Sequence, residues 1–367
     1  MSIGNPDWGA VVQARLAVVV LLLSMTTTGA HADSHALTRI ALGSRAFQWE
    51  DQSIFHHVAE ADPDLYLSLG DAIYADFNGE EVVPVTPESL RADWHRQGSI
   101  PAFRNLRERV PVMATWDNHD YGCHDCGSEF ALKEESESIF LEFWQVPDEA
   151  DVRQYPGVYQ SRVFGVTPYR AQVILLDTRT FRDRQLTAKR PEGSPGSLGK
   201  YEPNPDPEAR LLGEAQWAWL EQQLGRPAEL RFIASSTQIV PDQKGMDEWG
   251  NYPLERQRLF RMVEETVAEG VVLLSGNVHF AELSQTIEGP YPHFEFTSSG
   301  LTHVDDRYPE APNDFRVAYP VAEPNFGLVD IDWLADEGPL ITFRVVNEKG
   351  LQLMSHSISA SHLVIHQ

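Results

Sequence analysis

The stretch Leu65-Tyr66-Leu67-Ser68-Leu69-Gly70-Asp71-Ala72-Ile73-Tyr74-Ala75-Asp76 decides the predicted fold. Its first five residues form an apolar run typical of a buried strand, and Gly70 ends that run. Asp71 therefore lies at the carboxyl end of a strand, where open α/β sheets place their ligand sites. A carboxylate there can bridge two cations, because each of its oxygens can face a different metal. For Asp71 alone, capping of a turn after a core strand is the simpler interpretation.

Two later clusters of polar residues also follow predicted strands. Asp117-Asn118-His119-Asp120 comes after the apolar run at 110–115, and Gly276-Asn277-Val278-His279 comes after the run at 271–275. The carboxyl ends of parallel strands lie at one edge of a sheet, so we expect the three clusters to meet there. Together they offer carboxylate, amide and imidazole ligands, a combination that predicts a metal-assisted phosphoesterase.

The order of the predicted elements indicates an α/β fold. A strand at 39–45, a helix at 51–60 and the strand that ends at Asp71 form a β-α-β unit, and hence a parallel pair. Short strands alternate with turns after residue 281, which predicts two packed sheets flanked by helices. We find no linker, low-complexity tract or internal repeat, so residues 33–367 are predicted to form a single domain.

The first 32 residues have the order of regions found in a secretory signal peptide. Arg15 precedes an apolar run at 16–23, and Ala30-His31-Ala32 supplies a small-residue cleavage pattern. The run is too short to span a bilayer, so cleavage is favoured over an uncleaved membrane anchor. The sequence therefore predicts a periplasmic or secreted protein that is not inserted in a membrane after cleavage.

The charge of the chain limits the classes of partner. The formal net charge is −25, and such a surface repels the phosphates of nucleic acids. A phosphate ester remains a possible substrate, because bound metal cations reverse the local field. We therefore predict no nucleic-acid partner.

The chain has two cysteines, Cys123 and Cys126, with His124 and Asp125 between them. They follow a polar loop that contains glycine, whereas a thioredoxin-like redox motif needs a strand before it and a helix after it. In an oxidising compartment the spacing favours a local disulfide that stiffens the loop. Metal ligation by one cysteine is the second interpretation, and a thiol-disulfide oxidoreductase is a rival function.

Six motifs, in this order along the chain, make residues 39–303 resemble one family, the alkaline phosphatase D (PhoD-like) branch of the calcineurin-like metallophosphoesterases. The motifs are LGDAIYAD at 69–76, TWDNHDYG at 115–122, LDTR at 176–179, SSTQ at 235–238, LSGNVHF at 274–280 and TSSGLTH at 297–303. The resemblance implies a four-layer α/β/β/α sandwich of two mixed sheets flanked by helices. It also implies hydrolysis of phosphate mono- or diesters at a metal centre that often contains iron or calcium.

The resemblance assigns metal ligands to particular positions of this sequence. Asp71 corresponds to the bridging ligand and Tyr74 to a further ligand. Asn118 offers a neutral carbonyl oxygen suited to a hard cation. Asn277 and His279 complete the implied set, with His279 ligating through one ring nitrogen. A satisfied core histidine is the alternative for His279.

The resemblance also assigns the proton chemistry. His119 corresponds to the histidine that contacts the substrate phosphate and protonates the leaving oxygen. Asp120, next to it, is expected to orient that imidazole. Both residues are therefore predicted to be catalytic, with a metal-bound water as the attacking group.

The chain departs from the usual residues of the family at three positions. Arg45 stands where the family usually has Cys, and Asn277 where it usually has Asp; Asn118 also replaces an Asp but agrees with the wider superfamily. Neutral groups and one cation thus replace anionic ligands, so a trivalent iron site lacks the charge it needs. Three outcomes stay open: a divalent pair of calcium, manganese or zinc; a single metal beside the Arg45 guanidinium; or a catalytically impaired protein that binds a phosphorylated ligand.

Arg45 is predicted to be a third catalytic residue, and Arg179 and His303 are the candidate substrate-binding residues. Arg45 and Arg179 are predicted to hold the non-reacting phosphate oxygens, although Arg179 suits a structural ion pair equally well. His303 follows a Ser-Ser-Gly turn, which places it at the rim of the site or on the surface. The predicted partner is a small-molecule or lipid phosphate ester.

Overall fold

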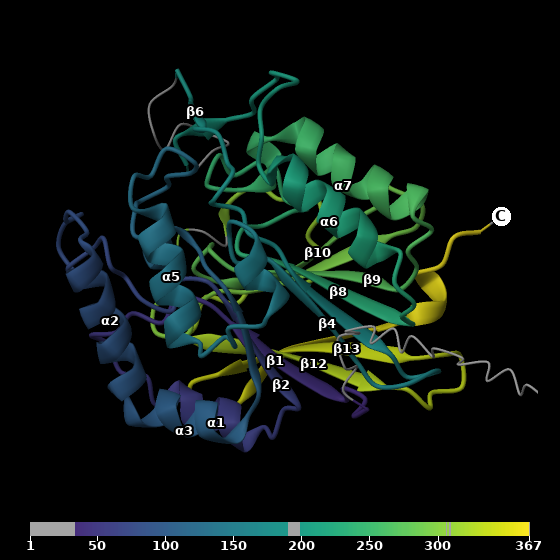
Figure 1. Cartoon of the computed structure of the whole chain (residues 1–367). Helices are drawn as coiled ribbons and strands as arrows, with labels where there is room; N and C mark the ends of the chain where they lie inside the picture. Colours follow the sequence, from purple (N-terminus) through teal and green to yellow (C-terminus); the bar gives the residue numbers. More distant parts are fainter. Residues whose placement is uncertain (1–33, 190–198, 306, 308–309, 367) are drawn as a thin grey trace, which may run out of the picture. The chain divides into compact units, whose positions relative to one another are not determined.

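Two six-stranded sheets face one another in the computed structural model, which describes residues 34–189, 199–305, 307 and 310–366 (Figure 1). The predicted signal sequence lies outside the described residues. The first sheet has the order β14-β13-β12-β1-β2-β3, and its strands are β1 (Arg39–Gly43), β2 (Leu65–Leu69), β3 (Val112–Thr115), β12 (Asn325–Asp332), β13 (Leu340–Asn347) and β14 (Gln352–Ser359). The second has the order β10-β11-β9-β8-β5-β4, formed by β4 (Gln160–Phe164), β5 (Ala171–Leu175), β8 (Leu230–Ser235), β9 (Val271–Ser275), β10 (Ala281–Thr286) and β11 (His293–Ser298).

Both sheets are mixed: the first is parallel in the half that ends at β3 and antiparallel in the other half, and the second is parallel at its centre and antiparallel at both edges. In the first sheet β1, β2 and β3 are parallel, with Leu42 opposite Leu67 and Leu67 opposite Met113. In the second sheet β5, β8, β9 and β11 are parallel. Parallel neighbours end at the same edge, so the residues that follow β1, β2 and β3 are brought together.

The alternation of β2 explains how the layers form. Leu65, Leu67 and Leu69 pack in the large buried cluster shared by both sheets, whereas Tyr66 packs on the opposite face in the cluster beneath the first helices. Side chains of a strand point alternately to the two faces of its sheet, so one strand contributes to two layers. This packing places the main core between the sheets.

Helices cover the outer face of each sheet, as Figure 1 shows. On the first sheet lie α1 (Ile54–Glu60) and α3 (Pro101–Arg109), with α2 (Pro87–Ser99) and α5 (Lys133–Phe143) beside them. On the second lie α6 (Gly213–Leu224) and α7 (Pro253–Glu265). The predicted α/β sandwich of two mixed sheets flanked by helices is confirmed.

One short helix, α4 (Asn118–Tyr121), was not predicted from the sequence. It begins directly after β3, where the Asp117 side chain accepts a hydrogen bond from the helix and Asp120 caps Asp117 in return. This reciprocal capping satisfies amides at the start of a helix that is too short to show a hydrophobic period. The turn delivers Asn118 and His119 to the strand edge.

Two further differences concern the predicted element bounds and the long loop. Helix α1 begins at Ile54 rather than at residue 51, because 51–53 form a turn in which Asp51 bonds to Ser53. The predicted loop at 185–204 contains a small antiparallel pair, β6 (Leu186–Thr187) and β7 (Tyr201–Glu202). None of the helices within the described residues is both long and apolar enough to cross a bilayer.

Candidate active site

Loops after strands of both sheets surround a pocket of about 460 Å³. Seven of the predicted functional residues line it: Arg45, Tyr74, Asn118, His119, Asn277, His279 and His303. The other lining residues are Phe77, Val82, His124, Asp125, Gly199, Lys200, Tyr201, Met246 and Asp247. The sequence clusters that follow β2, β3 and β9 therefore meet in one place, as expected.

The backbone of the site is held in an uncommon conformation. Arg45, Asp71, Asn277 and His279 have φ values of 70°, 50°, 70° and 62°. Residues with a Cβ adopt this left-handed region rarely, at a cost of about 1–3 kcal/mol each, and such residues gather at binding sites. Gly70 has a φ of 91°, and a Cβ there would lie only 2.5 Å from the Asp117 Cβ, so glycine lets the first two clusters approach closely.

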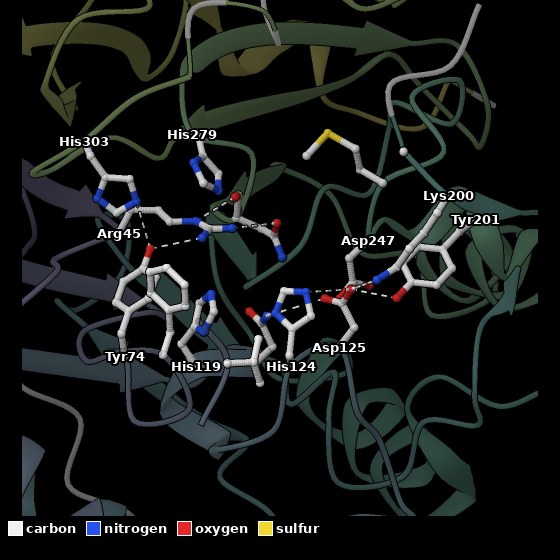
Figure 2. Close-up of a pocket in the computed structure, with 16 residues that line it drawn as sticks. Arg45, Tyr74, His119, His124, Asp125, Lys200, Tyr201, Asp247, His279 and His303 are labelled. Atoms are coloured by element: carbon white, nitrogen blue, oxygen red, sulfur yellow. Dashed lines mark hydrogen bonds and ion pairs between the residues drawn. The ribbon is translucent and has the colours of Figure 1, made fainter. Parts of the chain in front are cut away.

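The Arg45 guanidinium lies between Tyr74 and His279, two of the predicted ligands (Figure 2). Its Nε donates to the Asn277 backbone carbonyl at 2.8 Å and lies 3.1 Å from the Asp71 Oδ2. Nη1 donates to the Tyr74 hydroxyl at 3.0 Å, and Nη2 donates to the Asn277 Oδ1 at 3.3 Å. The side chain is 6% exposed, so these contacts fix a positive charge at the floor of the pocket.

The environment of Arg45 determines the charge of its neighbours. Burial disfavours the charged guanidinium, but nearby Tyr74 and Asp71 outweigh it and raise the pKa of Arg45 above its usual range. Burial raises the pKa of Tyr74 well above its usual value, so its hydroxyl stays protonated near neutral pH. Burial and then the Arg45 charge lower the pKa of His303 to about 4 and that of His279 well below its usual value. Both imidazoles are therefore neutral near pH 7.

His119 is held by Asp76, a residue that the sequence analysis did not assign. The His119 Nδ1 lies 2.5 Å from the Asp76 Oδ1, and both side chains are almost fully buried. The imidazole also stacks on the Tyr74 ring, with ring centroids 4.1 Å apart. One ring nitrogen is thus fixed by a carboxylate, which leaves Nε2 to act in the pocket that His119 lines. Asp76 ends the LGDAIYAD motif, so its position in the motif was the available signal.

The predicted role of Asp120 in orienting His119 is wrong. Its carboxylate instead accepts hydrogen bonds from the backbone amides of Asp71, Ile73 and Asp117. Helix α4 turns the two adjacent side chains in different directions, so sequence neighbours do not meet. Burial and then the nearby Asp71 raise the pKa of Asp120 well above its usual value. Asp120 ties the loop after β2 to the start of α4.

A family model described as PhoD-like phosphatase matches residues 42–332. This chain belongs to the PhoD-like phosphatase family. The match covers the whole second sheet, the strands β2, β3 and β12 of the first sheet, and every residue that lines the pocket. The resemblance inferred from the six motifs is therefore confirmed.

Individual relatives agree with this membership. The PhoD-like chain is 25% identical over 292 residues to alkaline phosphatase D of Bacillus subtilis (strain 168), a match that covers 67% of this chain and 46% of that protein. Thus the chain aligns with only about half the length of this curated relative.

Two solved structures share the fold. A structure described as PhoD has a TM-score of 0.64 at 18% identity, over 89% of this chain and 73% of that one. GAP50, described as the anchor in the inner membrane complex of Plasmodium, has a TM-score of 0.50 at 14% identity, over 90% of each chain. At these identities, both matches show the fold alone.

The metal that the PhoD-like family implies does not fit the predicted ligand set. The Arg45 guanidinium contacts the side chains of Asp71, Tyr74 and Asn277 at 3.1, 3.0 and 3.3 Å. A cation such as Zn²⁺ or Ca²⁺ needs those oxygens within about 2.0–2.6 Å, where it would be repelled by the guanidinium charge. Arg45 occupies the space that a metal would require and supplies a positive charge there, which faces the Asp71 Oδ2 as an ion-pair partner without a hydrogen bond to it.

A second group of residues fits a metal better. Asp76, His119 and His124 bring ligand atoms within 4.8 Å of one another. Beside them, the Asn118 Oδ1 and the Asp76 Oδ2 are buried and have no hydrogen-bond partner among the described residues. An oxygen that is buried without a hydrogen-bond partner lowers the stability of the folded protein, and a bound cation would offset that loss. The C-H-D-C sequence at 123–126 was the only signal for His124.

Arg179 does not line the pocket, contrary to its predicted substrate role. It is fully buried and forms ion pairs with Asp117 and, at 2.7 Å, with the Asp247 Oδ2. Burial raises the pKa of Asp117 to about 6, while Arg179 acts in the opposite direction. Arg179 therefore connects the loop after β5 to the loop after β3, which belongs to the other sheet.

A disulfide between Cys123 and Cys126 closes a short loop at the rim of the PhoD-like pocket. His124 and Asp125 lie inside this short covalent loop. Asp125 accepts a hydrogen bond from the Tyr201 hydroxyl at 2.6 Å and pairs with the Lys200 Nζ at 3.3 Å. The disulfide loop and the segment that begins β7 thereby form one side of the pocket (Figure 2).

Proposed function

We propose that this PhoD-like protein hydrolyses phosphate mono- or diesters in the pocket around Arg45. One observation carries the proposal: a buried guanidinium and a carboxylate-held imidazole line the same cavity. The contacts described above engage Nε and one N–H on each terminal nitrogen of Arg45. A guanidinium has five N–H donors, so two remain for the oxygens of a phosphate.

Arg45 and His119 have separate roles in the proposed reaction. Arg45 binds non-reacting oxygens of the phosphate and offsets the charge that develops on them. His119 donates a proton from Nε2 to the leaving oxygen, while Asp76 fixes the ring through Nδ1. Asp76 acts through His119 and is therefore a positioning residue in this step.

We further propose that hydrolysis depends on a metal held by Asp76, Asn118 and His124. The Asp76 Oδ2 and the Asn118 Oδ1 are two of the buried oxygens without a hydrogen-bond partner among the described residues, and His124 adds an imidazole. A divalent cation there would supply an activated water at neutral pH. Mixed oxygen and imidazole ligands favour zinc, iron or manganese over calcium.

The walls of the pocket indicate the kind of ester. Phe77, Val82 and Met246 contribute apolar surface, whereas Lys200 adds a positive charge. We propose a small-molecule or lipid phosphate ester whose alcohol part carries an apolar group. An aryl phosphate is therefore a suitable first substrate.

The test is turnover of an aryl and an alkyl phosphate monoester and of a diester, with zinc, manganese, iron and calcium added in turn. We expect Arg45→Met to lower kcat/KM by about 10²–10³-fold, the usual cost of removing one charge-stabilising donor. We expect His119→Asn to slow the alkyl ester more than the aryl ester, because a poor leaving group needs the proton more.

The matched control for Arg45→Met is Arg91→Met, because Arg91 pairs with Glu142 on the exposed surface of α2. This control should keep wild-type turnover. If no ester is hydrolysed with any of the four metals, the enzyme proposal fails. Retained binding of a phosphate ester would then favour the alternative of a catalytically impaired protein.

We also propose that the protein works outside the cytoplasm, in the periplasm or as a secreted protein. The signal-like pattern at 1–32 supports this location, as does the disulfide between Cys123 and Cys126. The mass of the exported protein checks it: cleavage after Ala32 predicts a first residue of Asp33. Recovery of the full chain in the cytoplasm would contradict the location.

A further inference from the structure

Arg45 occupies the place around which three of the predicted metal ligands are arranged. Its guanidinium contacts the Asp71 carboxylate, the Tyr74 hydroxyl and the side-chain oxygen of Asn277, all within 3.3 Å. His279 lines the same wall, across Arg45 from Tyr74 in Figure 2. A fixed cation thus stands where the shape and the ligands of the site would otherwise suit a metal.

The residues around the Arg45 guanidinium are arranged to stabilise a positive charge at this position. Asp71 is fully buried, and its Oδ1 accepts the backbone amide of His119 at 3.2 Å. Three of the residues around the guanidinium, together with Arg45 itself, hold the left-handed backbone conformation. Such strain persists only where the surrounding structure fixes it, and here it directs four polar groups at one point. A buried carboxylate without a cation would be strongly unfavourable.

We propose that Arg45 is an internal cation that replaces a metal: it closes the Asp71, Tyr74, Asn277 and His279 set to metal ions. The protein then has one metal position, at Asp76, Asn118 and His124, rather than two. A guanidinium cannot lose its proton under physiological conditions, so this charge does not depend on metal supply. The exclusion of metal follows from contacts within the chain and requires no catalysis; only the phosphate contact of Arg45 rests on the proposed function.

The first test counts metal ions in proteins equilibrated with zinc or manganese and then freed of excess metal. We expect Arg45→Cys to hold one metal per chain more than the wild type, because the change removes the cation and adds a thiolate ligand. Arg45→Lys is the matched control, since it keeps a positive charge and should gain no metal. Adding Asp71→Asn to Arg45→Cys should abolish the gain.

Arg45→Gly is a second variant that avoids dependence on the new thiolate. Its φ of 70° is natural for glycine, so the backbone should tolerate the change. Because the buried Asp71 then lacks its cation, we expect a lower Tm that zinc or manganese restores. The Tm of the wild type and of Arg45→Lys should respond less to the same metals.

Ferric ion gives a readout specific for the Tyr74 position. A phenolate bound to Fe³⁺ produces a visible charge-transfer band, which we expect for Arg45→Gly with ferric ion and not for the wild type; Arg45→Gly is used here because a thiolate would add its own band. Adding Tyr74→Phe to Arg45→Gly should remove the band. Equal metal counts in the wild type and Arg45→Cys would overturn the proposal, as would a ferric-tyrosinate band in the wild type.

The wild-type spectrum keeps the proposal testable even if every Arg45 variant fails to fold. These measurements also separate the inference from the proposed function. A wild-type protein that turns over esters but shows the band refutes the inference alone. A protein without turnover whose Arg45→Cys variant gains one metal refutes the proposed function alone.

Discussion

At the scale of single residues, the partner of His119 determines what its imidazole can do. Asp76 holds Nδ1 at 2.5 Å, whereas the carboxylate of the adjacent Asp120 bonds to backbone amides and to no side chain of the described residues. Asp120 is adjacent to His119 in the sequence and Asp76 lies 43 residues away, yet only Asp76 reaches the ring. Replacing each of these two carboxylates by an amide of the same shape can therefore separate the orientation of His119 from the stability of the loop.

We predict that Asp76→Asn lowers kcat about 100-fold or more, because the ring loses the charge that holds it for proton transfer. The loss should be larger for an alkyl phosphate than for an aryl phosphate, a difference that a purely structural defect would not produce. Steady-state kinetics of both esters provide the measurement. Asp148→Asn is the control, since Asp148 lies on the exposed surface. Because Asp76 is also a proposed metal ligand, the comparison is made with metal-saturated protein, and equal losses for the two esters would then contradict the positioning role.

At the scale of elements, strand β11 carries a buried histidine that has no hydrogen-bond partner among the described residues. His293 is fully buried, and neither of its ring nitrogens bonds to another described residue. Its ring packs against Phe260 of α7 and against Tyr291. Burial lowers the pKa of His293 from 6.5 to about 4, so the folded protein resists protonation at this position.

This pKa shift predicts how stability changes with pH. Between pH 6.5 and 4 the unfolded chain binds a proton at His293 that the folded chain does not, so the free energy of unfolding falls as the pH falls. Lowering the pH from 7.5 to 5 should cost about 2 kcal/mol from this group. Urea unfolding of the wild type and His293→Phe at both pH values measures the difference. Equal pH dependence in the two proteins would show that His293 does not titrate in this way.

At the scale of the whole molecule, buried ion pairs join the two sheets beneath the pocket. Arg179 follows β5 of the second sheet, Asp117 follows β3 of the first, and Asp247 lies in the loop after β8. Arg182 adds a second contact to Asp247 at 2.5 Å. All of these side chains are buried, so each charge depends on its partners.

We predict that Arg179→Met lowers the free energy of unfolding by about 3–5 kcal/mol, because it removes the buried ion-pair partner of Asp117 and leaves Asp247 with Arg182 alone among the described residues. Arg91→Met, which breaks an exposed ion pair, should cost less than about 1 kcal/mol. Denaturant unfolding of both variants gives the comparison. Equal small losses would mean that the loops are held together by packing alone.

The sequence by itself determined the architecture and the location of the site. Apolar runs such as 65–69 and 271–275 identify buried strands, and the polar residues after them mark the edge at which parallel strands end. These features are local or follow from the order of elements, so they can be predicted before the chain folds. Seven of the predicted site residues do line one pocket.

Only the tertiary structure decided which of these residues contact one another. Asp76 rather than Asp120 contacts His119, and Arg179 points into a buried ion-pair cluster. Arg45 lies among the residues that were predicted to bind a metal. Each of these outcomes depends on distances of about 3 Å between segments far apart in the sequence. Motifs fix which residues approach a site, but the direction of each side chain depends on the backbone conformation and packing of all the loops together.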